Sequence, residues 1–480
     1  MGSIAPDVPT FTPLELIGPR GYMRYVFTFP LAEDYVLEDV SRVLKAGYDA
    51  AAQRLPILAC EAIPDPTARQ DSVMKLQRLG PDAEESVLAK DLRTQDTLPS
   101  YAALKAQHFP VAAFDADTLC RRDIWPTDPG EHLPISLVQA NFIRGGLILT
   151  WCILHMAGDG TSFQTWMQIW AEECRRAQGL KITDPVILPP AIFADRERVM
   201  RSSGRNPGRI EDHPEYVVLS FKPPEGLPPK MLAKNHRAQV FYFSPEALAA
   251  LKKEASPRNA SEPTDVPWIS TNDALSALLW RTVMAVQWPL ETLDDDNYQD
   301  QDPESFFNIA LNGRLRTDPP VHPNTLGCFL EYIGVSMSVR KMLTSAHLAD
   351  LAVLIRRELH RVSNQHTDDV ISLIEQLDDI RKIFPKSLVD LPGFNCMLTS
   401  WVDFALYKLD WGTLLGGHIE SVRAPHVGVI NGLQVVLPNP PEGGMEVLVG
   451  VADGCSERLR MDPLWMSAVL DVNAEWYVQA

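Results

Sequence analysis

The sequence predicts an α/β or α+β protein built from layers of helices and sheets. Patterns typical of strands and patterns typical of helices alternate along the chain, and this mixing is the first observation behind the prediction. The second is the length of 480 residues, which exceeds what one compact core holds and indicates two or three domains. Hydrophobic residues make up 45% of the chain and charged residues 22%, which is the balance of an ordinary globular protein.

The N-terminal part is expected to contain a helix, a hairpin and a second helix. Residues 34–58 place apolar side chains at helical spacing, and this pattern is interrupted at Pro56. Residues 135–143 alternate between apolar and polar side chains, and residues 147–154 form a nearly continuous apolar run after a glycine turn. These segments predict a hairpin whose second strand is buried on both faces. A helical pattern resumes after Gly160.

A long stretch rich in proline and glycine, residues 185–234, predicts a crossover between two domains. We therefore divide the chain into an N-terminal domain (residues 1–200), a crossover linker (201–237) and a C-terminal domain (238–480).

The C-terminal domain opens with a predicted strand at residues 238–243. Ser244 then provides the N-cap of a helix, and residues 270–286 predict a second capped, apolar helix. The last hundred residues alternate between strand and turn patterns.

Charge and cysteine content exclude several classes of function. The formal charge of −18, from 44 Lys+Arg and 62 Asp+Glu, disfavours binding to nucleic acid and to anionic membranes. Binding of a phosphate-bearing molecule would require basic side chains gathered at one place. The seven cysteines are dispersed, with no CxxC pair, and indicate reduced thiols in a cytoplasmic protein. No signal peptide and no membrane-spanning apolar run is recognisable.

The sequence His155-Met156-Ala157-Gly158-Asp159-Gly160 is the strongest candidate for chemistry. It places a histidine where a buried strand ends, followed by a tight turn and a helix. Histidine is the side chain best suited to act as a general base near neutral pH. The spacing alone is weak evidence, because roughly one such pattern is expected by chance in a chain of this composition. The residues therefore leave two interpretations open: a catalytic base, or a strand-end histidine followed by an aspartate that caps a helix.

Six segments, ordered along nearly the whole chain, carry a family resemblance. They are His155 to Gly160, matching the family's HxxxDG; Gln139 to Thr150 before it; Leu55-Pro56-Ile57-Leu58-Ala59; Ser270 to Arg281; Leu311 to Arg316 with Leu326-Gly327; and Thr399-Ser400-Trp401 with Leu409-Asp410-Trp411-Gly412. Together they resemble the BAHD-type HxxxD acyltransferases, and among these the fungal trichothecene 3-O-acetyltransferase-like branch.

The resemblance implies a fold and a mechanism. The fold would be α/β, with two similar domains of chloramphenicol-acetyltransferase type, each a mixed sheet flanked by helices, and a tunnel at their interface. His155 would act as general base without a covalent intermediate. Trp401 and Thr399 would stabilise the oxyanion. Asp159 would point away from the substrate and pair with Arg314 or Arg316.

The resemblance also implies the co-substrate and the remaining site residues. Acyl-CoA, with acetyl-CoA as the expected form, would be the donor, and an alcohol of an apolar secondary metabolite the acceptor. Asp410 would have a structural role. The expected coenzyme contacts are Ser270, Thr271, Ser400, Trp411 and Gly412. No metal, no permanently bound cofactor and a monomeric state are implied.

One departure from the family keeps alternatives open. The second signature, DFGWG in the family, is degraded here to Asp410-Trp411-Gly412-Thr413-Leu414. An N-acyltransferase, or a repurposed cyclase-like or binding protein on the same fold, therefore remains an alternative.

Overall fold

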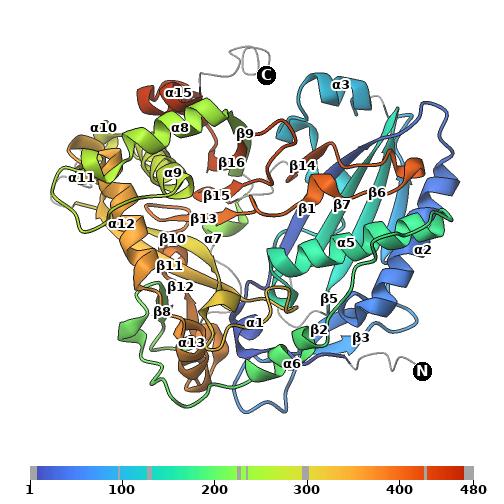
Figure 1. Ribbon diagram of the computed structural model, residues 1–480, viewed down its shortest axis with the longest axis horizontal. Helices are drawn as coiled ribbons and strands as arrows, with labels where there is room; N and C mark the ends of the chain where they lie inside the picture. The colour runs from blue at the N-terminus through green and yellow to red at the C-terminus, as the bar shows by residue number, and fades with distance from the viewer. Residues whose placement is uncertain are drawn as a thin grey trace.

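Two sheets, each covered by helices, form the two halves of the molecule in the computed structural model (Figure 1). The structure describes residues 8–95, 98–126, 132–223, 229–233, 236–293, 302–425 and 430–469. The mixed α/β class predicted from the sequence is confirmed.

The N-terminal half contains a five-stranded sheet. Its strands, in spatial order, are β14 (Ser421–Arg423), β1 (Tyr22–Pro30), β7 (Gly146–Leu154), β6 (Ser136–Ile143) and β4 (Val87–Asp91). The predicted hairpin is confirmed as β6 and β7, and every residue of both strands is buried. Gly145 makes the turn between them at φ 75°, a backbone conformation that favours glycine.

Two long helices, α2 (Leu37–Arg54) and α5 (Gly160–Ala177), pack against each other beside this sheet (Figure 1). They approach so closely at Gly47 that an added Cβ would lie 2.6 Å from the sulfur of Cys174. Trp170 fills the layer between them and donates its indole N–H to the carbonyl of Leu44 at 3.1 Å. This packing fixes the start of α5 at the exit of β7.

The C-terminal half contains a six-stranded sheet. Its spatial order is β11 (Leu330–Ser338), β10 (Glu304–Asn312), β13 (Cys396–Ser400), β15 (Leu433–Val436), β16 (Met445–Ala452) and β9 (His236–Phe243). Helix α9 (Thr271–Gln287) is almost completely buried, and α8 (Pro245–Glu254) and α12 (Leu348–Arg361) pack against it. Trp280 of α9 stacks on Phe307 of β10 with ring centroids 5.3 Å apart.

Two smaller sheets complete the described structure. One contains β3 (Met74–Arg78), β2 (Cys60–Pro64) and β5 (Leu133–Pro134). The other pairs β8 (Tyr216–Val218) with β12 (Ile383–Pro385). Within the described ranges, no helix combines the length and the apolar character needed to span a membrane.

The crossover is more structured than its composition indicates. Residues 201–223 include the 3-10 turn η4 (Ile210–Asp212) and β8, and they pack on α13 (His366–Glu375). At Gly208 the backbone, at φ 61°, runs so close to α13 that an added Cβ would lie 2.4 Å from the amide nitrogen of Leu373. Proline and glycine thus shape a docked segment here, not a free connector.

The division at residue 238 needs one correction. Residues 404–424 leave the C-terminal half and return to the N-terminal half, where β14 pairs with the edge strand β1. Trp411, Leu415 and Val422 belong to the same hydrophobic core as the helices α2 and α5. The second signature therefore lies in the N-terminal half, although the sequence division assigned it to the C-terminal domain.

Candidate active site

His155 stands directly after β7, at the start of the 3-10 turn η3 (His155–Ala157). Its backbone N–H donates to the carbonyl of Gly21 at 2.9 Å, which continues the pairing of β7 with β1. The sheet therefore holds the histidine backbone rigidly, and α5 begins five residues later at Gly160.

The imidazole of His155 is set up to be neutral. The residue is half-buried, and its Nδ1 is buried with no hydrogen-bond partner among the described residues. Burial lowers the pKa of His155 below its ordinary value of 6.5, and the carbonyl of His155 and the charge of Asp159 oppose this only in part. A neutral imidazole near pH 7 can accept a proton, which is the requirement for a general base.

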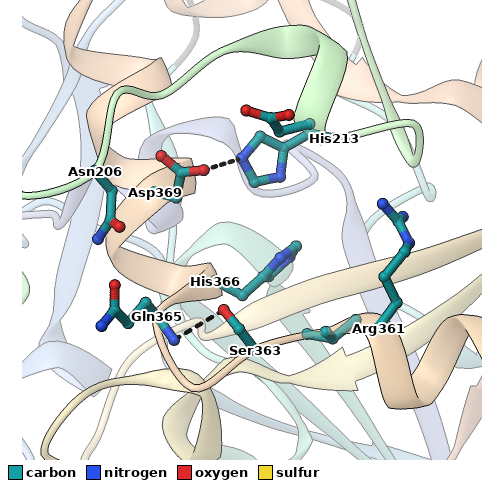
Figure 2. A pocket seen from close by; sticks show the side chains of 9 residues that line it. Asn206, His213, Arg361, Ser363, Gln365, His366 and Asp369 are labelled. Atoms are coloured by element: carbon teal, nitrogen blue, oxygen red, sulfur yellow. Dashed lines mark hydrogen bonds and ion pairs between the residues drawn. The ribbon is translucent and has the colours of Figure 1, made fainter.

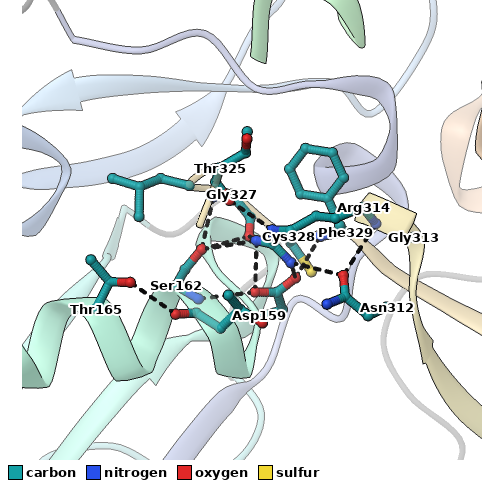
Figure 3. Close-up of polar contacts among 12 residues, drawn as sticks. Asp159, Ser162, Thr165, Asn312, Gly313, Arg314, Thr325, Gly327, Cys328 and Phe329 are labelled. Carbon is teal, nitrogen blue, oxygen red and sulfur yellow. Dashed lines mark hydrogen bonds and ion pairs between the residues drawn. The ribbon is translucent and has the colours of Figure 1, made fainter. Parts of the chain in front are cut away.

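Asp159 forms a buried ion pair with Arg314 (Figure 3). The two guanidinium nitrogens donate to the two carboxylate oxygens at 2.5 and 3.0 Å. Arg314 is 0% exposed and also lies over the ring of Phe329, 4.4 Å from its centroid. The backbone N–H of Phe329 donates to Asp159 at 2.9 Å. Such a bidentate pair fixes both partners in orientation as well as in distance.

The Asp159–Arg314 pair joins the two halves of the molecule. Asp159 also caps α5 by accepting from the N–H of Ser162 at 3.1 Å, so the helix-cap interpretation and the ion-pair interpretation both apply. The hydroxyl of Ser162 donates to the carbonyl of Gly327 at 2.8 Å and accepts from its N–H at 2.9 Å. Ser162, on the first turn of α5, was missed in the sequence; its place three residues after a capping aspartate was the available signal.

Arg316 does not reach Asp159. Arg316 is the last residue of the turn η6 (Gly313–Arg316), and its guanidinium donates to the carbonyl of Val362 at 3.2 Å. Of the two arginines named from the resemblance, Arg314 alone forms the predicted pair, and Arg316 as a partner of Asp159 is wrong. Successive residues of a tight turn point in different directions, and the sequence alone did not separate them.

The two glycines of the HxxxDG turn allow bulky neighbours to approach. An added Cβ on Gly160 would lie 2.2 Å from the ring of Phe404, and one on Gly158 would lie 2.6 Å from the ring of Trp166. Phe404 belongs to the segment that follows β13, and its N–H donates to the carbonyl of Trp401 at 2.9 Å. The turn that carries His155 is thus packed against the segment that carries Trp401.

Trp401 follows the last residue of β13 and contacts the N-terminal sheet. Its ring lies 4.9 Å from that of Tyr25 on β1, and Tyr25 stacks on Phe163 of α5 at 4.1 Å. Burial and then the charge of Asp159 raise the pKa of Tyr25, so this ring is close to the signature turn. Thr399 is half-buried on β13, and the hydroxyl of Ser400 is buried without a hydrogen-bond partner among the described residues.

The segment at Asp410 docks on the C-terminal end of α5. The N–H of Gly412 donates to Asp410 at 2.8 Å, and the carboxylate of Asp410 faces Arg175 at 3.5 Å. Gln178 donates to the carbonyl of Trp411 at 2.7 Å. These contacts give Asp410 and Gly412 a local role in shaping this loop.

Trp411 corrects one expectation. Its ring is 0% exposed and lies edge-on to Phe29 and to Trp170, each at a centroid distance of 5.3 Å. A ring with no accessible surface cannot contact a coenzyme, so the expected contact of Trp411 with acyl-CoA is wrong. A tryptophan in a core and one that lines a channel look alike in a sequence.

Ser270 and Thr271 lie at the start of α9, where Ser270 is the N-cap. Its hydroxyl accepts from the N–H of Asp273 at 3.1 Å, and Asp273 in turn accepts from the N–H of Ser270 at 2.6 Å. The hydroxyl of Ser270 therefore has a structural partner already.

A basic cavity of about 410 Å³ opens beside this helix start. Its lining includes Lys252, Lys253 and Arg258, with the exposed ring of Trp268 and with Ile269 directly before Ser270. These residues were not predicted from the sequence, although an adjacent lysine pair followed by an arginine was a usable signal in so acidic a chain. Three cations around one cavity are suited to bind phosphate groups.

Comparison with known proteins identifies the family of this chain. The Transferase family model matches residues 123–452, and a model of the trichothecene 3-O-acetyltransferase-like N-terminal domain matches residues 22–174. The eremophilane O-acetyltransferase prx11 of Penicillium rubens is 27% identical, over 94% of this chain and 96% of its own length.

Two further comparisons differ in how much of the other protein this chain covers. The enoyl-CoA isomerase/hydratase claC of Penicillium crustosum is 26% identical over 90% of this chain, and this chain spans about half of that relative, 47% of its length. The crystal structure of F. graminearum TRI101 complexed with coenzyme A and deoxynivalenol superposes with a TM-score of 0.78. It covers 96% of this chain and 98% of that one at 21% identity, which shows a common fold.

The Transferase family match extends over more than half of the chain and includes both the signature turn at His155 and the segment that returns from the C-terminal half. The N-terminal domain match contains the whole of β1, β6, β7 and the turn that follows. The chain therefore belongs to the Transferase family, with an N-terminal domain of the trichothecene 3-O-acetyltransferase-like type, and is an acyltransferase.

Proposed function

We propose that this enzyme transfers an acetyl group from acetyl-CoA to a hydroxyl of an apolar secondary metabolite. The observation that carries the proposal is His155, half-buried at the strand exit, with a pKa that burial lowers, in a turn that the Asp159–Arg314 pair anchors. The donor and the type of acceptor follow from the names of relatives: prx11 is an eremophilane O-acetyltransferase, and the structural neighbour was solved with coenzyme A and deoxynivalenol.

In the proposed reaction His155 takes the proton of the acceptor hydroxyl while its oxygen attacks the thioester carbonyl carbon. The C–O bond forms, and the carbonyl oxygen becomes an oxyanion that the Trp401 indole N–H and the Thr399 hydroxyl stabilise. The C–S bond then breaks, and the thiolate of coenzyme A receives the proton from the imidazolium. The ester and the free thiol leave, and no covalent enzyme intermediate is needed.

For the coenzyme we propose that Lys252, Lys253 and Arg258 bind its phosphates. The cavity that they line is the local gathering of positive charge that an enzyme of net charge −18 requires for such a ligand. Its wall ends next to Ser270 and Thr271, which we propose as further contacts. We also propose Ser400, whose buried hydroxyl has no partner among the described residues, and Gly412.

We further propose that the enzyme works as a monomer in the cytoplasm. The seven cysteines are all free thiols, which fits a reducing compartment. Size-exclusion chromatography with light scattering would test the monomeric state, because a dimer would elute at twice the chain mass of 53.6 kDa.

The test of the proposed function compares wild type with His155→Ala. Calorimetry should show equal acetyl-CoA affinity for both proteins, whereas transfer to an alcohol, and slow thioester hydrolysis without acceptor, should fall by about 10²- to 10⁴-fold in the variant. His322→Gln serves as the control, because Nδ1 of that histidine accepts from the exposed backbone N–H of Asn324, a contact that the proposed reaction does not use, and the variant should leave both quantities unchanged. If neither protein binds acetyl-CoA, the donor is wrong and a repurposed, cyclase-like or binding protein replaces the transferase. If an amine is acylated in preference to an alcohol, the enzyme is an N-acyltransferase.

A second test addresses the phosphate site. The double variant Lys252→Ala/Lys253→Ala should raise the KM for acetyl-CoA and leave kcat unchanged, since the phosphates are bound equally in the ground state and in the transition state. Lys45→Ala is the matched control. It removes a lysine of α2 that pairs with Glu85, and it should leave the KM for acetyl-CoA unchanged. Equal KM values for the double variant and for wild type would remove the cavity from the coenzyme site.

A further inference from the structure

A second polar cavity, of about 210 Å³, lies where the crossover packs on α13 (Figure 2), and His155 is not among the residues that line it. Its wall is almost entirely polar or charged, and it includes two histidines from segments far apart in the sequence. The residues are Asn206, Asp212, His213, Arg361, Val362, Ser363, Gln365, His366 and Asp369. The mechanism proposed above uses none of them.

Three potential metal ligands converge at this wall. The Nδ1 atom of His213 lies 3.0 Å from a carboxylate oxygen of Glu215, and the same oxygen lies 3.5 Å from Nε2 of His366. These three atoms all lie within 4.8 Å of one another. Ligands about 2.0–2.1 Å from a tetrahedral Zn²⁺ are separated by roughly 3.3 Å, so the observed spacing suits a shared cation.

A further carboxylate, from the C-terminal sheet, contacts one of these three residues. Glu331 on β11 is 0% exposed, and its carboxylate lies 3.0 Å from Nε2 of His366. This contact lacks hydrogen-bond geometry: within the described part of the chain, both carboxylate oxygens of Glu331 and Nε2 of His366 are buried without a hydrogen-bond partner. A buried carboxylate left in this way is costly, and a bound cation removes the cost.

Asp369 supplies the orientation that metal-bound histidines usually have. Its carboxylate lies 3.1 Å from Nε2 of His213, the ring nitrogen opposite to Nδ1 (Figure 2). A carboxylate that accepts from Nε2–H leaves Nδ1 unprotonated and directed at the ion. Asp369 thus favours the tautomer of His213 that can coordinate.

The four proposed ligands carry a charge that suits a divalent ion, and Asp369 adds a further negative charge through its contact with His213. Glu215 and Glu331 bring two negative charges, and two neutral imidazoles bring none. Arg361 reaches Glu215 only at 4.0 Å with a side chain that is 47% exposed, so its neutralising effect is screened by solvent. A mixed imidazole and carboxylate set is one that Zn²⁺ and neighbouring transition metals accept.

We propose that His213, Glu215, Glu331 and His366 bind one divalent transition-metal ion of the Zn²⁺ type. The ion has a structural role: it joins the crossover, β11 and the first turn of α13. It also supports the turn η6, since an added Cβ on Gly313 would lie 2.9 Å from Cγ of Glu331, and the hydroxyl of Thr367 donates to the carbonyl of Gly313 at 2.9 Å. Arg314, the partner of Asp159, is the next residue of that turn.

The experiment uses the full-length chain without a histidine tag, stripped with a chelator and titrated with Zn²⁺ and separately with Co²⁺. Wild type should bind one equivalent of Zn²⁺ by calorimetry, should gain the visible absorption of tetrahedral Co²⁺ and should unfold at a higher temperature with metal than without. Glu331→Gln and His366→Gln should lose stoichiometric binding. Asp369→Asn should weaken binding by about 10- to 100-fold, because it acts through His213.

Asp212→Asn is the matched control, since this carboxylate lines the same cavity but faces Arg209 at 2.9 Å. It should bind Zn²⁺ as wild type does. The proposal is overturned if folded wild type binds no Zn²⁺ and shows no Co²⁺ absorption, in which case the cluster is an ion network between histidines and carboxylates. It is equally overturned if Glu331→Gln and His366→Gln retain full affinity, since the ion then binds elsewhere.

Discussion

Asp159 and Asp410 illustrate how much the surroundings of a carboxylate decide. The side chain of Asp159 is 11% exposed and accepts from Arg314, Ser162 and Phe329. Asp410 is 49% exposed and faces its one arginine at 3.5 Å. Removing one partner of a buried pair leaves an uncompensated charge, whereas an exposed pair is screened by water.

Asp159→Ala should therefore lower the free energy of unfolding by about 3–5 kcal/mol, because it leaves Arg314 buried and unpaired. Asp410→Ala should lower it by no more than about 1 kcal/mol. Urea denaturation followed by circular dichroism measures both values. Equal losses in the two variants would mean that the ion pair across the two halves contributes no more than a surface contact.

The pH dependence of the reaction reports on His155. Protonation removes its capacity to accept a proton, so activity should be lost as the pH falls through the pKa of the free enzyme. Because burial lowers that pKa, the acidic limb of kcat/KM should have its midpoint below 6.5, and the enzyme should keep most of its activity at that pH. Initial rates at substrate concentrations well below KM, between about pH 5 and 8, give the profile of kcat/KM. A midpoint above 6.5 would show that Asp159 or another anion outweighs burial.

At the scale of elements, the loop from Asp410 to Gly417 depends on glycines with different surroundings. Gly416 has φ 70°, and an added Cβ would lie 1.9 Å from the carbonyl oxygen of Pro30 at the end of β1. Gly417 has φ 86° and open space around the same position. The two positions share the backbone strain and differ in the steric contact.

Gly417→Ala should cost about 1–2 kcal/mol of stability, the cost of a left-handed backbone for a residue with a Cβ. Gly416→Ala should cost about 1–3 kcal/mol more, because it also pushes the loop away from β1. Urea melts of the two variants beside wild type give the difference. If Gly416→Ala is no worse than Gly417→Ala, the docking of this loop contributes little to the fold.

Elements with a strong local pattern could be predicted from the sequence, and elements defined by distant contacts could not. The hairpin before His155 and the capped helix after Ser270 were predicted because alternation and capping residues are local. The strand β14 was not, since three residues have no measurable periodicity. The pairing of Asp159 with an arginine 155 residues later came from the family resemblance, and the choice of Arg314 over Arg316 needed the structure.

The same distinction applies to the sites. His155 stands in a contiguous motif, whereas the proposed metal ligands are scattered over positions 213, 215 and 366, with Glu331 added by its contact with His366, and no motif describes this spacing. Nothing in the sequence around Trp411 indicates that its ring is buried. Lys252 and Lys253 resemble ordinary residues at the end of a helix until the fold places Arg258 and Trp268 beside them.

At the scale of the whole molecule, the chain crosses between the two halves three times. It passes from the N-terminal half to the C-terminal half, returns to form β14, and crosses again to form β15 and β16. The N-terminal core includes Leu406, Trp411, Leu415 and Val422 from the returning segment. Each buried side chain of this size contributes about 1.5–3 kcal/mol, and a whole domain retains only about 5–15 kcal/mol. The N-terminal half therefore depends on residues that follow it by more than two hundred positions.

Residues 1–233, which end before β9, should consequently fail to fold cooperatively when expressed alone, whereas co-expression with residues 234–480 should give a soluble complex with acetyl-CoA binding. Thermal unfolding by circular dichroism and co-purification of the two fragments measure this. A cooperative melt of the first fragment by itself would show that its sheet is stable without β14.

The returning segment also affects folding during synthesis, because the N-terminal half cannot be completed until that segment has been made. Val422 is added 268 residues after Leu154, the last residue of β7, and residues still inside the ribosome cannot pair with β1. While the C-terminal half emerges from the ribosome, the edge of β1 is not yet paired with β14. The N-terminal core also still lacks the apolar side chains of the returning segment. Such an edge invites contact with neighbouring nascent chains. Translation speed through the second half, and chaperones that cover the waiting sheet, should therefore govern the yield of active enzyme more than the final stability of either half.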